Sequence, residues 1–242
     1  MMERSTIQRS IPAILIALLF AGTVFLGFMA LEFGEPRVDQ EGATAGEYIA
    51  GGNNDTGSAN LVTSVVVNYR GFDTLGEVTI LFLASTGVGA LLSVMEMDTP
   101  RKQKNKAREP SFILQQGSRL ILPLIILFGV YVFVHGHLSP GGGFQGGVII
   151  ASGLLLFYIS NREAKARHRV LSWVESTSGL AFIGIGVIGL ATASIFLDSH
   201  GVVNKDIGLL ISAGLLPLIY IAIGLKVGSE MTGLVDRFRG DV

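Results

Sequence analysis

The chain has no cysteine and few charged residues. Of its 242 residues only 15% are charged, 49% are hydrophobic, and the net charge is −1. The absence of cysteine excludes disulfides, thiolate metal sites and a cysteine nucleophile. Soluble domains carry about 25% charged residues, so this chain has too little charge to cover a water-exposed surface. The composition therefore indicates a protein in lipid, and the net charge gives no sign of nucleic-acid binding.

Six apolar stretches approach the length of about 20 residues that a helix needs to cross a bilayer. They are residues 11–31, 78–95, 120–134, 144–161, 176–197 and 207–225. The first follows Arg4 and Arg9, as a signal peptide would, but it exceeds the roughly 7–15 apolar residues of such peptides and no clean cleavage site follows. We therefore expect an uncleaved helix, and an all-α integral membrane protein with six transmembrane helices.

The distribution of basic residues predicts the orientation. With six spans both termini lie on one side, and that side receives 15 lysines and arginines against 3 on the other. Basic residues concentrate on the cytoplasmic side of membrane proteins. We expect a multi-pass protein of the cell membrane with cytoplasmic N- and C-termini.

A polar, basic segment between two prolines divides the spans into two and four. It predicts a two-helix module at residues 1–98, a cytoplasmic linker at 99–114 and a four-helix module at 115–242. An ordinary charged loop is the alternative for the linker. The segment between the first two spans, residues 32–73, is expected on the external side. Its middle, residues 41–60, is rich in Gly, Ala, Asn and Asp, which predicts a flexible loop.

The end of that external segment has a helical pattern. Leu61, Val65, Tyr69 and Phe72 recur at helical spacing and predict a short amphipathic helix at the outer membrane surface. The β-branched run at residues 65–67 would also suit a strand.

The first candidate site precedes the second span, where residues 68–77 read NYRGFDTLGE. An acidic side chain near lipid is costly unless it is paired, hydrated or protonated. Glu77 is therefore a candidate cation or proton carrier, tuned by Asp73 and Arg70. The alternative is a capping box, in which Thr74 and Glu77 satisfy backbone N–H groups at a helix start.

The second candidate site joins the third and fourth spans, where residues 135–147 read HGHLSPGGGFQGG. His135 and His137 could relay protons, because histidine titrates near neutrality; a tight turn with surface histidines is the alternative. The remaining residues predict a structural motif of close backbone packing: Pro140, Gly141, Gly142, Gly143, Phe144, Gly146 and Gly147. Without a third ligand nearby, we expect no metal.

Other features are expected to be peripheral. Lys226 and Glu230 follow the last span and are expected to be solvated at its cytoplasmic end, and Pro217 is expected to bend that helix. The sequence contains no phosphate-binding glycine loop, cofactor fingerprint or nucleophile constellation. We therefore expect neither a cofactor nor a catalytic site of its own.

Both candidate segments resemble known families. Residues 115–239, with the HGHLSPGGGFQGG stretch, resemble the MnhB/MrpB family. Residues 11–96, with NYRGFDTLGE, resemble the two-span MbhE-type module, which also ends the large MrpA antiporter subunit. The resemblance implies a fused membrane subunit of an Mrp-type Na⁺/H⁺ antiporter, with other membrane subunits as partners and Glu77 as a pathway carboxylate.

Two other functions remain open. Related modules occur in membrane-bound hydrogenases and in other complex I-like respiratory complexes, where redox chemistry in other subunits drives ion pumping. The third possibility is a scaffold subunit that conducts no ions.

Overall fold

The computed structural model describes residues 15–26, 29, 44–98, 109–161, 164, 166–193, 196–197, 208–210 and 212–238. They belong to two compact units, residues 1–46 and residues 47–242. Most of the predicted linker, and the basic residues Arg4, Arg9, Arg37 and Lys205, lie outside the described part of the chain.

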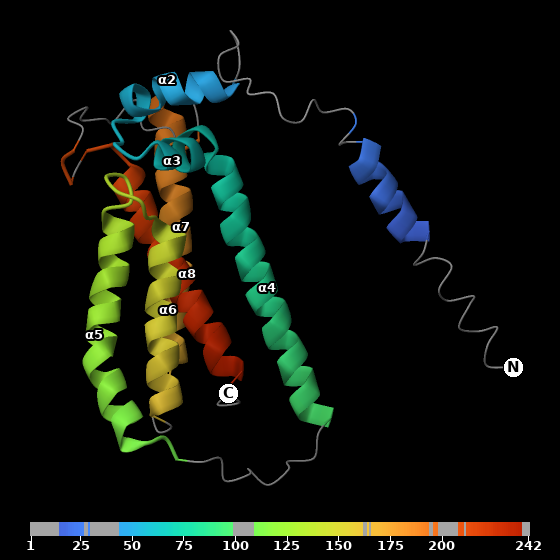
Figure 1. Cartoon of the computed structure of the whole chain (residues 1–242), viewed down its shortest axis with the longest axis vertical. Helices are drawn as coiled ribbons and strands as arrows, with labels where there is room; N and C mark the ends of the chain where they lie inside the picture. Colours follow the sequence, from blue (N-terminus) through green and yellow to red (C-terminus); the bar gives the residue numbers. More distant parts are fainter. Residues whose placement is uncertain are drawn as a thin grey trace, which may run out of the picture. The chain divides into compact units, whose positions relative to one another are not determined.

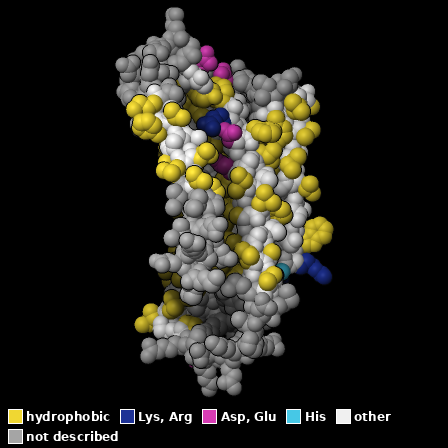
Figure 2. Space-filling model, turned by 90° about the vertical axis from the view of Figure 1, so that its right-hand side faces the viewer, with side chains coloured by type: hydrophobic (Ala, Val, Ile, Leu, Met, Phe, Trp, Pro, Cys, Tyr) yellow, Lys and Arg dark blue, Asp and Glu magenta, His cyan; other side chains and the backbone are white. Residues whose placement is uncertain are grey.

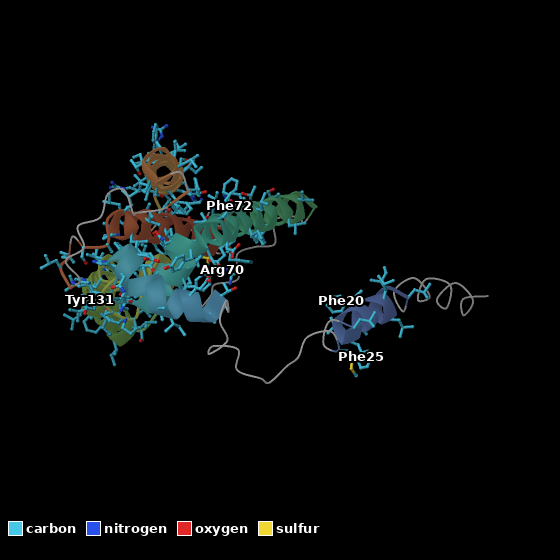
Figure 3. All side chains as sticks on the ribbon, turned by 90° about the horizontal axis from the view of Figure 1, so that it is seen from above. Phe20, Phe25, Arg70, Phe72 and Tyr131 are labelled. Atoms are coloured by element: carbon cyan, nitrogen blue, oxygen red, sulfur yellow. The ribbon has the colours of Figure 1, made fainter. Side chains whose placement is uncertain are left out.

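Five long apolar helices confirm the all-α membrane architecture. They are α4 (Gly71–Asp98), α5 (Phe112–Val134), α6 (Gly143–Ser160), α7 (His168–Ala193) and α8 (Leu216–Phe238), each long and apolar enough to cross a bilayer. The first unit contains a shorter apolar helix, Leu15–Leu26, whose Phe20 and Phe25 project from it in Figure 3. The described residues contain no β-strand.

The second unit is a bundle in which α8 contacts every other long helix. It packs against α6, α7, α4 and α5, and α5 packs along α6. The helices α2 (Thr44–Thr56) and α3 (Leu61–Thr63) lie at the end of the bundle where α4 begins (Figure 1). The central position of α8 explains why it is the most buried of the five long helices.

Glycines allow these helices to touch at the backbone. A Cβ on Gly147 would lie 2.8 Å from the Gly224 carbonyl oxygen and 2.9 Å from the Gly228 nitrogen, so α6 and α8 have no room for a side chain there. Similarly, a Cβ on Gly129 of α5 would lie 2.9 Å from the Gly146 oxygen of α6. The close approach at Gly146 and Gly147 therefore depends on small residues, as in other membrane bundles.

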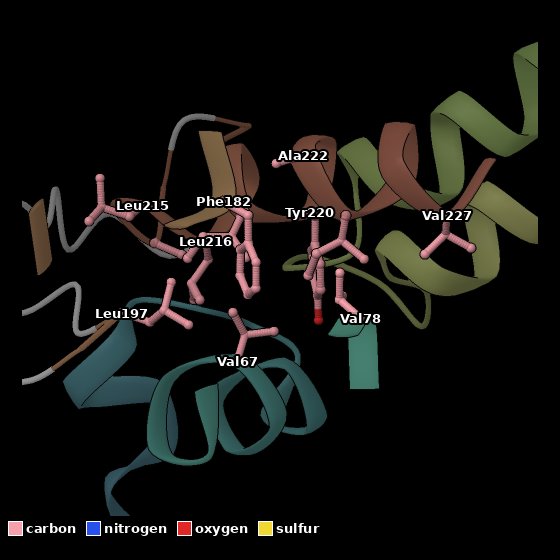
Figure 4. Close-up of a cluster of buried hydrophobic side chains, with 12 residues drawn as sticks. Val67, Val78, Phe182, Leu197, Leu215, Leu216, Tyr220, Ala222 and Val227 are labelled. Atoms are coloured by element: carbon pink, nitrogen blue, oxygen red, sulfur yellow. The ribbon is translucent and has the colours of Figure 1, made fainter. Parts of the chain in front are cut away.

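An apolar cluster joins the N-terminal and C-terminal parts of the second unit. Figure 4 shows Val67 and Leu197 facing Leu216, with Val78 close to Tyr220. Val67, Leu197 and Leu216 are 0% exposed. Burial of such side chains stabilises the contact by about 1.5 to 3 kcal/mol each. The two predicted modules therefore share one core in this unit.

The external segment differs from the prediction of a loop. Residues 44–56 form α2, and the amphipathic stretch forms α3 followed by a π-helix, η1 (Ser64–Tyr69), so the helix prediction is confirmed and the strand alternative is wrong. The buried face is also different, because Thr63, Ser64, Val67 and Asn68 are buried rather than the predicted apolar stripe. Thr63 Oγ1 donates to the Gly136 carbonyl, and the Ser64 hydroxyl bonds to that of Thr56, which is why these two side chains point inward.

Both ends of the last predicted span require correction. The last span begins at Leu216 rather than at residue 207 and continues to Phe238, through residues that the prediction placed outside the membrane. Pro217 is consequently the second residue of α8, where its missing N–H is harmless. The predicted bend at Pro217 is therefore wrong, whereas Pro123 lies in the interior of α5.

Candidate functional site

The first candidate site is a groove beside the first turns of α4. Its volume is about 720 Å³, and its lining includes Arg70, Asp73, Glu77, Ile80 and Phe144. The side chain of Glu77 is exposed in this groove. Figure 2 shows a small group of basic and acidic side chains among hydrophobic ones near one end of this face, and Figure 3 places Arg70 and Phe72 at the head of α4. Glu77 thus lies in a mainly apolar groove that also contains Arg70 and Asp73.

Arg70 and Asp73 form an ion pair within this groove. Both Nε and Nη2 of Arg70 lie 2.6 Å from Oδ2 of Asp73, with the two side chains 61% and 55% exposed. Such an exposed pair adds little stability. It does balance the charge of Asp73, whereas Glu77 forms no ion pair with any described residue. The structure thus brings together the three predicted residues but assigns them different electrostatic roles.

The capping-box alternative for Glu77 is wrong. Helix α4 already begins at Gly71, so Thr74 is inside its first turn rather than at its N-cap. The Thr74 hydroxyl donates to the Val66 carbonyl at 2.7 Å. Glu77 therefore has no capping role at the start of α4.

The two histidines of the second site have different surroundings. His135 is half-buried and stacks on Tyr131, with ring centroids 4.3 Å apart. His137 is fully buried, and the Leu209 carbonyl accepts from its Nε2 at 3.3 Å. Burial lowers the pKa of His137 below its usual 6.5, which favours the neutral ring. The groove that holds Glu77 is lined by neither histidine.

The loop that carries these histidines is bound by three polar side chains of the N-terminal module. Asn60 Nδ2 donates to the carbonyls of Gly136 and Ser139 at 2.8 and 2.9 Å. Thr63 Oγ1 donates to the Gly136 carbonyl at 2.7 Å, and Ser58 Oγ donates to the His137 carbonyl at 2.8 Å. We call Ser58, Asn60 and Thr63 with these carbonyls the polar joint.

The polar joint was missed from the sequence. A glycine-rich turn leaves carbonyls that no regular structure satisfies, and such groups need partners when they are buried. That requirement signals a partner but does not identify it, because Asn60 and Gly136 are far apart in the chain. Figure 4 shows Tyr220 pointing toward this region, where its hydroxyl donates to Thr63 Oγ1 at 2.8 Å.

The glycine motif leads directly into α6. Helix α6 starts at Gly143, one residue before the predicted span, with Gly142 as its N-cap residue, and Ser139 and Pro140 precede it in the loop. Gly142 has φ +157°, and a Cβ on Gly143 would lie 2.9 Å from the Tyr220 carbonyl oxygen. These glycines therefore allow the loop to pack closely against α8.

The expectation that Lys226 and Glu230 are solvated is wrong, because both side chains are buried. They are 8% and 2% exposed, and Lys226 Nζ lies 3.2 Å from Glu230 Oε2. The prediction placed them in solvent because hydropathy ended the last span before them. Within the described residues, no group of three or more acidic or histidine side chains is placed to hold a metal.

Comparison with known families identifies both parts of the chain. Residues 113–233 match the family described as a domain related to the MnhB subunit of Na⁺/H⁺ antiporters. The chain belongs to the MnhB family. Residues 9–104 match the MbhE family, which is described as the E subunit of MBH. Both resemblances inferred from the sequence motifs are therefore confirmed.

Relatives of this MnhB-family chain vary in how much of their length it covers. An uncharacterized protein of Methanocaldococcus jannaschii, MJ1307, is 31% identical over 192 residues, which are 69% of this chain and 72% of the relative. The probable A/B subunit of a K⁺/H⁺ antiporter from Rhizobium meliloti is 30% identical over 168 residues, 60% of this chain and 17% of the relative. The B subunit of a Na⁺/H⁺ antiporter from Bacillus subtilis is 39% identical over 56 residues, which are 23% of this chain and 39% of the relative.

Two solved complexes contain chains of similar structure. A chain of the membrane-bound sulfane sulfur reductase, an archaeal respiratory membrane complex, is 39% identical with a TM-score of 0.72, covering 96% of this chain and 98% of that one. A chain of the Mrp complex from Dietzia sp. DQ12-45-1b is 23% identical with a TM-score of 0.67. The match covers 97% of this chain and 26% of that one. The second likeness concerns the fold alone. This MnhB-family chain is a multi-pass membrane protein.

Proposed function

We propose that this chain is a membrane subunit of a multisubunit monovalent cation/proton antiporter of Mrp type. The observation that carries the proposal is Glu77, a carboxylate without an ion-pair partner among the described residues. It lies in a mainly apolar groove at the start of a membrane helix, within a family whose named relatives are antiporter subunits. The chain contributes to ion passage and has no catalytic site of its own.

The proposed topology has six spans and two modules. Residues 1–98 form the MbhE-like module, 99–114 the cytoplasmic linker and 115–242 the MnhB-like module. The family matches at 9–104 and 113–233 support this division, and the apolar helix Leu15–Leu26 supports a further span beside the five long helices. The excess of basic residues supports cytoplasmic termini.

Glu77 is proposed to carry the ion, either as a bound cation or as a proton. Asp73 is already balanced by Arg70, so the described lining of the groove presents one uncompensated negative charge. A neighbouring membrane subunit is proposed to cover the groove, because an ion site must be shielded from lipid. His135, at the outer end of α5, is proposed to exchange protons with the surface, whereas His137 holds the loop in place.

A specific observation favours a second candidate function. The chain matches 98% of a chain in the sulfane sulfur reductase at 39% identity, a fuller correspondence than the partial matches to the two named antiporter relatives. On that alternative the same subunit would pass ions inside a respiratory complex, and other subunits would supply the redox energy. A scaffold subunit that conducts no ions is the third candidate.

The test is ion transport by the purified complex in proteoliposomes. Glu77→Gln is expected to slow Na⁺-coupled proton transport at least about tenfold, which corresponds to about 1.4 kcal/mol in the barrier. Glu47→Gln, an exposed carboxyl of α2, is the matched control and should transport normally.

The outcomes separate the three candidates. Transport driven by an imposed ion gradient alone supports the antiporter, and transport that requires an electron donor supports the respiratory complex. If Glu77→Gln assembles and retains full transport in both conditions, Glu77 is not in the pathway and the scaffold role is favoured.

A further inference from the structure

Three charged side chains meet between α7 and α8, away from Glu77. Lys226 Nζ lies 3.2 Å from Glu230 Oε2 and 3.8 Å from Glu175 Oε1. The same ammonium lies 5.1 Å from the centre of the Phe82 ring of α4. We call Lys226, Glu230 and Glu175 the seam cluster.

The seam cluster is not explained by stability. Removing charges from water costs several kcal/mol per ion, and a buried ion pair often stabilises a fold less than apolar residues of the same size would. Moreover, Glu230 Oε1 is buried with no hydrogen-bond partner among the described residues. One ammonium and two carboxylates sum to −1, so the cluster is balanced only when it takes up one positive charge.

A cleft gives access to the cluster from one side. It has a volume of about 270 Å³ between α4 and α7, and Glu175 and Lys226 are among its lining residues. Glu175 is 25% exposed there, while Glu230 is buried behind Lys226. A positive charge that enters the cleft therefore reaches the carboxylate of Glu175 first. Lys226 lies within ion-pair distance of both Glu175 and Glu230, so it couples the two carboxylates.

Among the described residues, no other charged group competes in the immediate surroundings. The lining residues from α4 are Leu75, Val78, Thr79 and Phe82, which are uncharged, and α6 contains no charged residue. Farther along α8, Asp236 is paired with His168 at 2.9 Å, and Arg237 donates to the Ser85 carbonyl at 3.2 Å. These two groups have partners of their own, so the unbalanced charge beside the cleft between α4 and α7 belongs to the seam cluster.

The chemistry of the cluster favours a proton over a metal cation. The Lys226 ammonium lies between the two carboxylates and repels a second cation from the place where both could ligate it. A proton needs no such place, because it binds to one carboxylate oxygen. When hydronium in the cleft transfers its proton to a carboxylate, water is left and the cluster becomes neutral.

We infer that Lys226, Glu230 and Glu175 form a proton-exchange site in the membrane, separate from Glu77 and reached through the cleft between α4 and α7. The inference rests on the proposed ion-transport function, to which it adds residues for the proton. Glu77 and the seam cluster then serve as two ion-binding positions in one chain.

The test uses the assembled complex in proteoliposomes, with transport measured from pH 6 to pH 9. Glu230→Gln and Glu175→Gln are each expected to slow proton transport at least about tenfold and to change its pH profile. The double variant Lys226→Met/Glu230→Leu replaces the pair by apolar side chains of similar size. It is expected to assemble normally and still lose proton transport. Glu109→Gln, an exposed carboxyl outside the long helices, is the control.

Each result decides the question. A merely structural ion pair predicts that the assembled double variant transports at the normal rate, and this result overturns the inference. An unchanged rate and pH profile in Glu175→Gln overturns it equally, and because Glu175 is partly exposed this variant is expected to assemble. If the unmodified complex transports no ions, the proposed function itself fails; if it transports and the seam variants match it, only this inference fails.

Discussion

Replacing Gly147 by alanine tests the packing on which both sites depend. The new Cβ would lie 2.8 Å from the Gly224 oxygen, 2.9 Å from the Gly228 nitrogen and 2.9 Å from the Val227 Cβ. Two of these atoms are backbone and cannot rotate away, so α6 must separate from α8. Overpacking of this kind costs about 1 to 3 kcal/mol. Alanine otherwise gains about 1 kcal/mol over glycine in a helix, an advantage that this site cancels.

The matched control is Gly184→Ala in α7, where a Cβ meets nothing within 4 Å. Because both variants gain the same helix propensity, they should differ in free energy of unfolding by the overpacking cost of about 1 to 3 kcal/mol, with Gly147→Ala the less stable. The assay is reversible unfolding of the purified chain in mixed detergent micelles. If Gly147→Ala is as stable as Gly184→Ala, α6 and α8 do not pack at their backbones and the described bundle is wrong.

Three further predictions address the joint, the pH response and the topology. Asn60→Ala should destabilise the chain by about 2 kcal/mol in the same unfolding assay, because two carbonyls lose a donor, whereas exposed Asn54→Ala should change it by less than about 0.5 kcal/mol. Because the folded-state pKa of His137 lies below the usual 6.5, only the unfolded chain binds a proton just below that pH; stability should therefore fall as pH drops through about 6.5, and His137→Gln should flatten this slope. In a chain without cysteine, Asn54→Cys should react with an impermeant maleimide in intact cells and Arg167→Cys only after lysis; the reverse pattern would contradict the proposed orientation.

The apolar helices could be predicted because lipid imposes a length and a hydropathy that the sequence displays directly. The helix α2 could not, since its Gly- and Asn-rich sequence has low helix propensity. Tertiary contacts compensate: the Tyr69 hydroxyl donates to Asp55 Oδ2 at 2.6 Å, and Thr56 and Ser64 hydroxyls lie 2.7 Å apart. Such contacts join residues whose pairing no local pattern reveals.

The site could be predicted only in part. The motif around Glu77 is visible in the sequence, and the structure places Arg70 and Asp73 beside it as an ion pair. The seam cluster was missed because a lysine and a glutamate lower the mean hydropathy, so the predicted last span ended before Lys226. Only the packing of α7 on α8 brings Glu175 to Lys226 and buries Glu230.

The most direct test of the account is whether Glu77 lies within a subunit interface of an assembled complex. Glu77→Cys introduces a single thiol into a chain that has none, and its reaction rate with a water-soluble maleimide can be measured in the isolated chain and in the complex. The account predicts rapid labelling of the isolated chain, where the groove is open, and strong protection in the complex. Equal labelling in both states would contradict it, because Glu77 would then lie on an uncovered surface rather than in an ion pathway.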